Sequence, residues 1–155
     1  MPKEKTKEET PPADPADGEK TQESTTGNKS FLELRDVDIP SNNTYYRNFR
    51  GHMTISPKGR SFKQEVSEKC RGCSKVLGPV VLSIEFRFRD KRRRDLDNYF
   101  KALFDACKDR LFEDDSEIVA IHSYKRIGCK DDAGVTVEVV SANSKEVPQV
   151  SFCKI

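Results

Sequence analysis

The sequence predicts a two-layer α+β domain in which two main helices lie on a mixed β-sheet, in the order β-α-β-α-β-β. Two observations lead to this prediction. Residues 78–89 alternate apolar and polar side chains, which is typical of a strand with one buried face. Residues 96–111 repeat apolar side chains at spacings of three and four, which is typical of a helix that lies on a sheet.

The first 30 residues are expected to form a disordered tail before this domain. Only Met1, Ala13 and Ala16 are apolar there, and the segment holds four of the chain's eight prolines. Such a segment buries too little apolar surface to offset the entropy that ordering costs. The domain itself is expected over residues 31–143, with a C-terminal extension of undetermined structure over 144–155.

Three elements are predicted in the first half of the domain. Residues 31–39 alternate well enough to be a strand. Residues 40–51 contain a proline and paired asparagines and close on a glycine, so they are predicted to be a loop. Residues 56–69 are predicted to be a helix, because Phe62 and Val66 give it a short apolar face.

The main strand over 78–89 should bury one side and leave the other open. Arg87 and Arg89 lie on the open side, where they would meet solvent or a polyanion. The helix opens near Asp95, and its apolar stripe consists of Leu96, Tyr99, Phe100, Leu103, Phe104, Cys107 and Leu111. Strands over 117–127 and 134–141 follow, and the turn-like segment between them predicts that they pair as a hairpin.

Composition restricts the setting in which this domain works. No window approaches the roughly 18 apolar residues of a membrane span, and the N-terminus has no apolar signal region. The protein is therefore expected to be intracellular, in the cytoplasm or the nucleus, and not secreted. Five cysteines then indicate free thiols. Cys70 and Cys73 form a C-x-x-C, which alone is only a weak sign of zinc binding.

Carboxylates flank the second helix. Asp95 and Asp97 stand at its start, and Asp114 and Asp115 follow its end. They can be explained separately, as an N-cap, a favourable first-turn charge and a solvated turn. The alternative is a shared site for a hard divalent cation, with Asp115 completing it if the chain returns toward the start of the helix.

Basic residues surround these carboxylates. Arg87, Arg89 and Lys91 precede Arg92, Arg93 and Arg94, and such a cluster holds phosphates. Acid at the centre with base around it is the arrangement that a metal-dependent nuclease needs. Lys101, one turn after Asp97, would stabilise the transition state or the leaving oxygen. Asp97, Lys101 and Asp105 also have the i, i+4, i+8 spacing of helical ion pairs.

Two separated motifs carry a family resemblance. "RRRDLDNYFKALFDA", followed by "EDDSEI", resembles the signature of the RusA family of Holliday-junction resolvases, and "PSNNTYYRNFRG" resembles that family's N-terminal segment. The similarity covers roughly residues 37–141. It implies a RusA-like, structure-selective endodeoxyribonuclease that resolves four-way DNA junctions by symmetric phosphodiester hydrolysis, in recombination and repair. It further implies Mg²⁺ or Mn²⁺ as cofactor and a homodimer, because two identical sites suit a two-fold symmetric junction.

The resemblance also implies roles for individual residues. Asp95, Asp97 and Asp115 would be the metal-binding and catalytic aspartates, and Lys101 the catalytic lysine. Asn98 would orient a ligand. The DNA-binding candidates are Asn43, Tyr46, Arg92, Arg93, Arg94 and Lys125.

Two other hypotheses remain open at this level. The chain could be a non-catalytic module that binds branched nucleic acid on the same fold. It could also be an interaction protein whose carboxylates are only caps and helix ion pairs, which explains each residue singly but not the joint match to two motifs.

Overall fold

A computed structural model describes residues 27–145 of the chain. The tail predicted over residues 1–30 lies almost wholly outside the described residues, as does most of the C-terminal extension predicted over 144–155.

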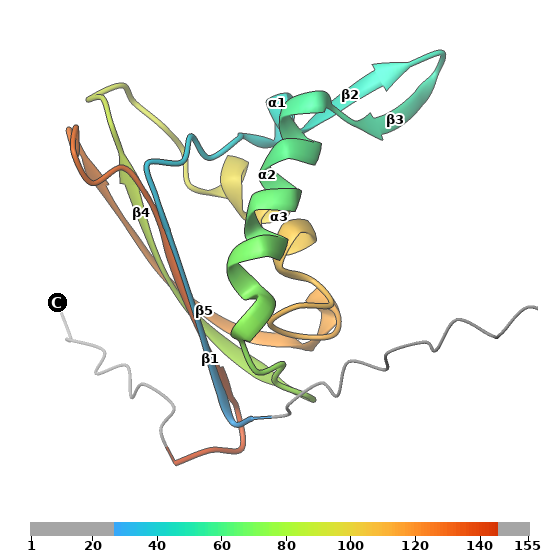
Figure 1. Cartoon of the computed structure of the whole chain (residues 1–155), viewed down its shortest axis with the longest axis vertical. Coiled ribbons are helices and arrows are strands. Elements are labelled where there is room, and N and C mark those ends of the chain that lie inside the picture. Colours follow the sequence, from blue (N-terminus) through green and yellow to red (C-terminus); the bar gives the residue numbers. More distant parts are fainter. Residues whose placement is uncertain (1–26, 146–155) are drawn as a thin grey trace, which may run out of the picture.

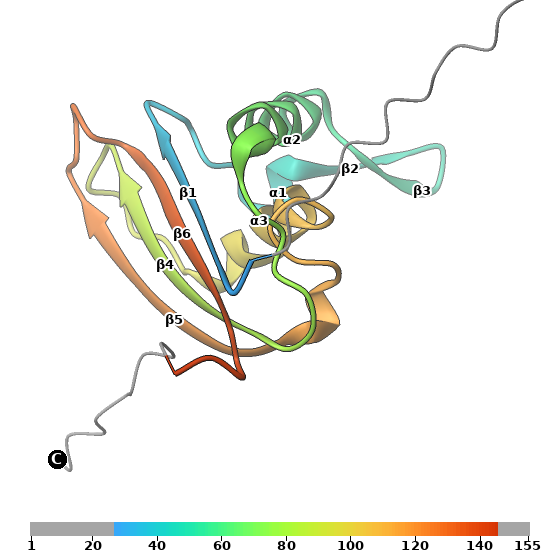
Figure 2. The same cartoon turned by 60° about the horizontal axis from the view of Figure 1, so that its bottom comes forward.

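A four-stranded sheet forms one layer of the domain (Figure 1). Its strands are β1 (Lys29–Arg35), β4 (Val80–Phe88), β5 (Ile118–Ile127) and β6 (Gly134–Ser141), and their spatial order is β1-β6-β4-β5. β4 pairs with β5 in parallel and with β6 in antiparallel orientation, so the sheet is mixed. Helices α2 (Pro57–Lys69) and α3 (Asp97–Cys107) cover the same face of it (Figures 1 and 2). The predicted fold class is confirmed.

The predicted hairpin between the last two strands is wrong. β5 and β6 flank β4 on opposite sides, and β6 lies between β1 and β4. Burial explains this order. Val135, Val137 and Val139 of β6 are at most 1% exposed, whereas Val119 and Tyr124 of β5 are 60% and 59% exposed. The strand with the more continuous apolar face takes the interior position, and the more polar strand takes the edge.

The segment predicted to be a loop over 40–51 contains regular structure. A short helix, α1 (Asn42–Tyr45), leads into β2 (Tyr46–Phe49), which pairs with β3 (His52–Ile55). Arg50 and Gly51 join the two strands with φ values of 52° and 81°, as a two-residue hairpin turn of the type I′ kind requires. In both ribbon views this β2–β3 hairpin projects away from the sheet and helices (Figures 1 and 2).

The predicted helix over 56–69 is confirmed in α2. Ser56 caps its N-terminus by accepting a hydrogen bond from the Gly59 backbone N–H at 3.0 Å, and Pro57 occupies the first turn. Phe62 and Val66 are buried against the core as predicted. Two single-turn 3₁₀ segments, η1 (Cys70–Gly72) and η2 (Asp115–Glu117), follow α2 and α3.

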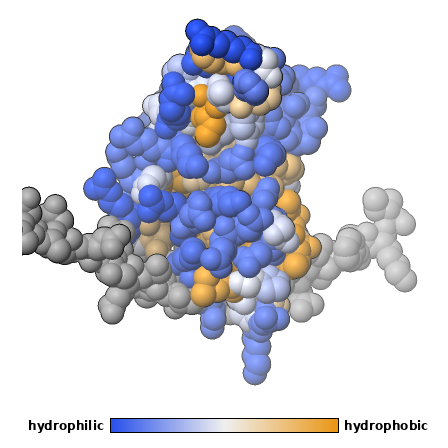
Figure 3. All heavy atoms as spheres, turned by 90° about the vertical axis from the view of Figure 1, so that its right-hand side faces the viewer, coloured by the Kyte–Doolittle hydropathy of each residue, from blue (hydrophilic) through white to orange (hydrophobic). Residues whose placement is uncertain are grey.

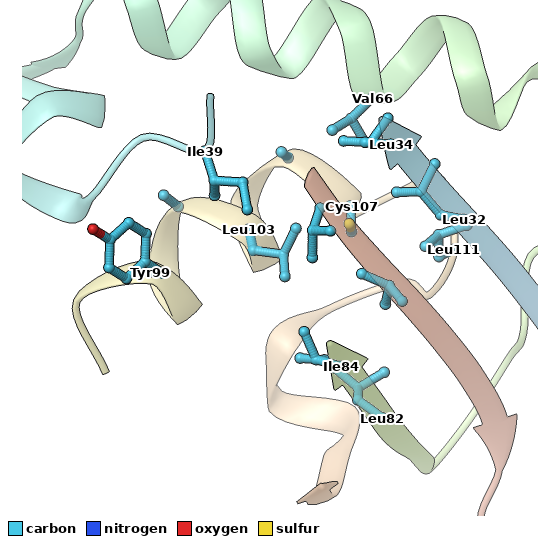
Figure 4. Close-up of a cluster of buried hydrophobic side chains, with 14 of the residues drawn as sticks. Leu32, Leu34, Ile39, Val66, Leu82, Ile84, Tyr99, Leu103, Cys107 and Leu111 are labelled. Carbon is cyan, nitrogen blue, oxygen red and sulfur yellow. The ribbon is translucent and has the colours of Figure 1, made fainter. Parts of the chain in front are cut away.

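The core lies between the sheet and the two helices. Figure 4 shows side chains from β1, β4, α2 and α3 meeting there. Leu103 and Cys107 of α3 are fully buried, and Leu111, just beyond the helix end, is buried with them. The apolar stripe predicted for this helix therefore faces the sheet. Within residues 27–145, no helix has the length and apolar character needed to cross a membrane.

Candidate active site

Two carboxylates stand at the start of α3. The helix begins at Asp97 after Leu96 in the N-cap position, and no side chain caps it. Asp95 takes part only through its backbone carbonyl, which accepts from the Asn98 N–H at 3.3 Å. Neither the Asp95 nor the Asp97 carboxylate makes a hydrogen bond or ion pair with any residue from 27 to 145. The interpretation of Asp95 as a side-chain N-cap is therefore wrong, and both exposed carboxylates have oxygens available for another ligand.

The chain after α3 returns to the side of that helix. Asp115, in η2, places a carboxylate oxygen 3.6 Å from the Lys101 ammonium nitrogen. Lys101 lies one helical turn beyond Asp97, so the contact brings together two segments of the acidic motif that are 14 residues apart. The chain was predicted to fold back so that Asp115 lies near the start of α3. In the structure, Asp115 reaches Lys101, one helical turn after that start.

Asp105 is the second carboxylate that contacts Lys101. It accepts from Lys101 at 3.1 Å, as the i, i+4 spacing predicted. Partial burial raises the pKa of Asp105, and the nearby Asp115 carboxylate adds to that rise. Sequence reasoning took Asp105 for a helix ion pair and missed its place beside Asp115. One ammonium thus lies between two carboxylates from different segments.

Asp114 has a different role from its neighbour. Its carboxylate accepts from the Ser116 backbone N–H at 3.0 Å, which caps η2, and it forms an ion pair with Lys108. The hydrogen bond from Lys108 is the main reason that the pKa of Asp114 lies well below its usual range. Asp114 is therefore a turn-capping group, and Asp115 remains for Lys101.

The donor chemistry at the start of α3 fits a hard divalent cation. Mg²⁺ commonly takes one or two carboxylates and fills its other positions with waters and substrate phosphate oxygens. Asp95 and Asp97 supply carboxylates without competing partners among the described residues. Over residues 27–145, however, no three His, Cys, Asp or Glu side chains are grouped closely enough to hold a metal ion. A joint role for Asp95, Asp97 and Asp115 stays a prediction.

The arginines before α3 fall into two kinds. Arg92 and Arg93 are exposed. Arg94 is half-buried: its guanidinium donates to Asp90 at 2.9 Å and lies 4.7 Å from the centre of the Phe88 ring. This hydrogen bond is the largest cause of the low pKa of Asp90. Asp90 also accepts from the Arg92 backbone N–H at 3.0 Å, so it fixes the loop that carries the predicted phosphate-binding residues.

Lys125 joins the same region from another strand. It pairs with Phe86 across the parallel β4–β5 ladder, so its side chain lies on the helix-covered side of the sheet. Its ammonium donates to the backbone carbonyl of Arg94. The structure thus brings Lys125 to the loop before α3, and its contact with phosphate stays a prediction.

Arg87 is not available for phosphate binding, contrary to the sequence prediction. It does lie on the sheet face away from the helices, yet it is only 3% exposed. Its guanidinium donates to the Asp132 carbonyl at 2.9 Å, Thr136 Oγ1 at 2.6 Å and Glu85 Oε2 at 3.2 Å, and also forms ion pairs with Glu33 and Asp132. Three carboxylates neutralise it.

The two DNA-binding candidates upstream, Asn43 and Tyr46, also differ in whether their side chains are accessible. Asn43 is exposed and has no hydrogen-bond partner among residues 27–145. The Tyr46 hydroxyl is buried without a partner in the same range, and its ring lies edge-on to Tyr45 at 4.8 Å, so Tyr46 packs in the base of the hairpin. The residue that ties this segment to the site is Asn42, which sequence reasoning missed: its Oδ1 accepts from the Ala102 N–H of α3 at 3.1 Å.

The C-x-x-C forms no metal site with the described residues. Cys73 donates to the Phe31 carbonyl at 3.2 Å, and burial raises the pKa of the Cys70 thiol to about 12. Cys107 is fully buried, as its periodicity predicted. These thiols have packing roles in the structure.

Comparison with known proteins identifies a family that matches most of the described domain. The family model "Endodeoxyribonuclease RusA" matches residues 37–140. The crossover junction endodeoxyribonuclease rusA of Enterobacteria phage 82 is 43% identical over 84 residues, which are 52% of this chain and 70% of that protein. The proteins called crossover junction endodeoxyribonuclease RusA in Shigella sonnei strain Ss046 and Escherichia coli strain K12 are 42% and 40% identical over stretches of the same length and coverage.

Proposed function

The chain belongs to the RusA family of endodeoxyribonucleases, and from this premise we propose that it is a metal-dependent crossover junction endodeoxyribonuclease. It would cut four-way DNA junctions symmetrically by phosphodiester hydrolysis, in DNA recombination and repair. Such an enzyme acts wherever its host keeps DNA, in the cytoplasm or the nucleus. The relatives named above are called crossover junction endodeoxyribonucleases.

One observation supports the proposal most strongly: the contact of Lys101 with Asp115 at 3.6 Å. Lys101 and Asp115 come from two parts of the acidic motif, and a merely structural helix would not need the second part to return beside the first. The ion pair itself is largely exposed, since the side chains are 57% and 39% accessible, so it contributes little to folding stability. A contact that contributes so little to stability is better explained by a role in the proposed site, to which the same motif assigns Asp95 and Asp97.

Each residue then has a defined task. Asp95, Asp97 and Asp115 would hold Mg²⁺ or Mn²⁺, which when bound stabilises charge at phosphorus and lowers the pKa of an attacking water. Lys101 would donate a hydrogen bond to a phosphoryl oxygen or the leaving oxygen.

Further tasks follow for the residues around the centre. Asp105 and Asp115, which both contact the Lys101 ammonium, would hold it in place. Asn98 would orient a ligand from the first turn of α3. Asn43, Arg92, Arg93, Arg94 and Lys125 are the residues we propose for holding the DNA backbone beside this centre, whereas Tyr46 packs in the base of the hairpin.

A homodimer is part of the proposal. A four-way junction has two-fold symmetry, and two identical sites can cut opposed strands symmetrically. We expect the full chain to sediment as a dimer at micromolar concentration, and a monomer that cleaves junctions in pairs would contradict this part of the proposal.

The decisive test is cleavage of a synthetic four-way junction, with linear duplex of the same sequence beside it. Wild type should make paired cuts in the junction only, in Mg²⁺ and not in EDTA. Asp97→Asn should lower the cleavage rate by at least about 100-fold, the scale on which removal of a charge-stabilising group acts, because it removes one carboxylate charge and leaves the fold intact.

The matched control is Asp109→Asn. Asp109 is an exposed aspartate with a φ of 66°, a backbone conformation that asparagine adopts readily, and it lies outside the proposed site. It should cleave like wild type. Junction binding without cleavage by the folded wild type would contradict the enzyme and favour a non-catalytic DNA-binding module.

A further inference from the structure

We propose that the β2–β3 hairpin is a second DNA-binding element, which inserts Phe49 against an unstacked base at the branch point while Arg47 and Arg50 hold the neighbouring phosphates. This inference rests on the proposed function, since it assumes branched DNA as the ligand. It assigns a binding role to a part of the molecule that contributes no residue to the catalytic centre.

The hairpin presents apolar side chains to solvent. Its strands pair Asn48 with Met53 and Phe49 with His52, next to the turn. Phe49 is 50% exposed and Met53 is 70% exposed. In the view that looks onto the end of the hairpin, hydrophobic side chains at the top of the molecule are surrounded by hydrophilic ones (Figure 3). Large apolar side chains kept at an exposed tip indicate a surface that binds something.

Charge identifies the kind of partner. The sequence from residue 39 to residue 64 contains five basic residues and no Asp or Glu, in a chain where 35% of residues are charged. Among the described residues, the side chains of Arg47 and Arg50 have no carboxylate partner. Cations that nothing neutralises attract a polyanion.

The two arginines also lie against the aromatic ring. The guanidinium carbons of Arg47 and Arg50 are 5.6 Å and 5.3 Å from the centre of the Phe49 ring. Such contacts use the flat face of a guanidinium and leave its N–H donors free for phosphate oxygens. The combination of an aromatic group with two phosphate-binding groups matches one exposed base and its backbone.

Hydrogen bonds connect the base of the hairpin to the start of α2 and to α3. The Ser56 hydroxyl donates to the Thr44 carbonyl at 2.6 Å, and the Ser56 N–H donates to the Tyr45 carbonyl at 2.8 Å. Tyr45 is fully buried. The bond from Ala102 of α3 to Asn42 then connects this base to the helix that carries Asp97 and Lys101.

The shape suits DNA as well. A two-stranded ribbon is narrow enough to enter the major groove. Apolar side chains that DNA-bending proteins insert between bases are typically Phe, Leu, Ile or Met, and both Phe49 and Met53 are present near the tip. Bases at a branch point have fewer stacking neighbours than bases in a duplex, so an aromatic group gains most there. The hairpin should therefore increase the preference for junctions over linear DNA.

The test measures DNA binding separately from cleavage. The full chain is titrated in EDTA with a junction, and with linear duplex, that carry 2-aminopurine at the branch point or its equivalent. Phe49→Ala should weaken junction binding about tenfold, the scale of losing one aromatic stack, leave duplex binding nearly unchanged, and abolish the rise in 2-aminopurine fluorescence that wild type causes. Arg47→Gln with Arg50→Gln should reduce the slope of log K against log salt by about two.

Phe31→Ala is the matched control. Phe31 is 53% exposed, almost the same as Phe49, but it lies on β1 of the sheet. It should bind and unstack the junction like wild type. Thermal unfolding of every variant confirms that the comparison is made between folded proteins.

Each outcome decides between the claims. Hairpin variants that bind and unstack like wild type would overturn this inference, even if Asp97→Asn still abolished cleavage and the proposed function stood. Hairpin-dependent junction binding by a wild type that never cleaves would support the inference and contradict the nuclease. A wild type that binds no junction at low salt would overturn both. Hairpin variants that become monomeric while their DNA affinity per monomer is unchanged would mean that a second copy of the chain occupies the tip.

Discussion

Arginine occurs in two regions of this molecule with opposite surroundings. On the open face of the sheet, Arg87 is 3% exposed and lies among Glu33, Glu85 and Asp132. On the β2–β3 hairpin, Arg47 and Arg50 are exposed and contact the Phe49 ring, with no carboxylate partner among residues 27–145. The same side chain therefore ties strands together in one region and remains free to bind an anion in the other.

The difference shows that an arginine count does not locate a nucleic-acid surface. What matters is whether carboxylates from other segments reach the guanidinium first. At Arg87 they come from β1, β4 and the segment before β6, all of which the sheet brings together. The hairpin pairs only with itself, and neither of its strands contains an acidic residue.

The largest effect that would sharpen this comparison is on stability. Arg87→Ala should lower the free energy of unfolding by about 3 kcal/mol, because the buried cation of a network is removed and its carboxylates lose their partner. Arg47→Ala should change it by less than about 0.5 kcal/mol, as exposed substitutions do. Urea unfolding of both variants measures the difference, and equal values would contradict the contrast between the two regions.

A carboxylate added to the hairpin should neutralise Arg47, as Glu33, Glu85 and Asp132 neutralise Arg87 on the sheet. Thr54 stands directly opposite Arg47 across the β2–β3 ladder. Thr54→Glu should weaken junction binding about tenfold, or about 1.4 kcal/mol, because it pairs with Arg47 and repels phosphate. The new ion pair between Arg47 and the glutamate at position 54 should leave the stability of the hairpin unchanged or raise it slightly. Thr54→Gln is the control of equal size, and it should bind like wild type; equal loss in both variants would exclude charge as the cause.

A third comparison, with a smaller expected effect, is between Arg93 in the loop before α3 and Arg126 on β5. Arg93 is exposed without an ion-pair partner among the described residues, whereas Arg126 on β5 pairs with Glu85 at 3.3 Å. Arg93→Gln should weaken binding to junction and duplex alike by about threefold and reduce the salt slope by about one. Arg126→Gln should leave DNA binding unchanged. A loss at Arg126 equal to that at Arg93 would place DNA on the open face of the sheet.

The smallest effect concerns pH. Arg94 is intermediate between buried Arg87 and the exposed hairpin arginines, because it is half-buried and pairs with a single carboxylate, that of Asp90. Its hydrogen bond lowers the folded-state pKa of Asp90, so ionised Asp90 stabilises the fold above the unfolded pKa of about 4, and that contribution is lost as the pH falls through the lower folded value. The difference in Tm between wild type and Asp90→Asn should therefore shrink below about pH 4. A difference that stays constant down to pH 2 would show that the ionised carboxylate is not responsible.

Local pattern was sufficient for most of the sheet and both main helices. The alternation in β4, the stripe of α3 and the apolar pair Phe62 and Val66 in α2 each depend on neighbours in the sequence, and each is confirmed. The position of β6 depends instead on which strand buries more apolar surface against β1 and β4. That competition is decided across the whole sheet, so the turn between β5 and β6 was a misleading signal for a hairpin.

The hairpin and the site show the same limit. Phe49, Met53 and their neighbours have no buried face, so β2 and β3 lack the apolar alternation by which strands are found. In the site, the acidic motif predicted roles for Asp97, Lys101 and Asp115, and the structure brings Lys101 and Asp115 together. It gave no sign of Asn42, because the hydrogen bond from the Ala102 N–H to Asn42 joins residues that are 60 positions apart in the sequence. Contacts between distant segments leave little trace in local composition.

The base and the tip of the β2–β3 hairpin differ in how freely their residues can be substituted. At its base, a β-carbon on Gly59 would lie 2.5 Å from the Tyr45 carbonyl oxygen, so no larger residue fits there without a backbone shift. At its tip, the side chains of Arg47, Phe49 and Met53 support no part of the core. If the hairpin binds DNA as we propose, mutations at its tip would alter ligand preference at almost no cost to folding, and the hairpin would be the part of the domain best suited to evolve or to be engineered for a new DNA structure.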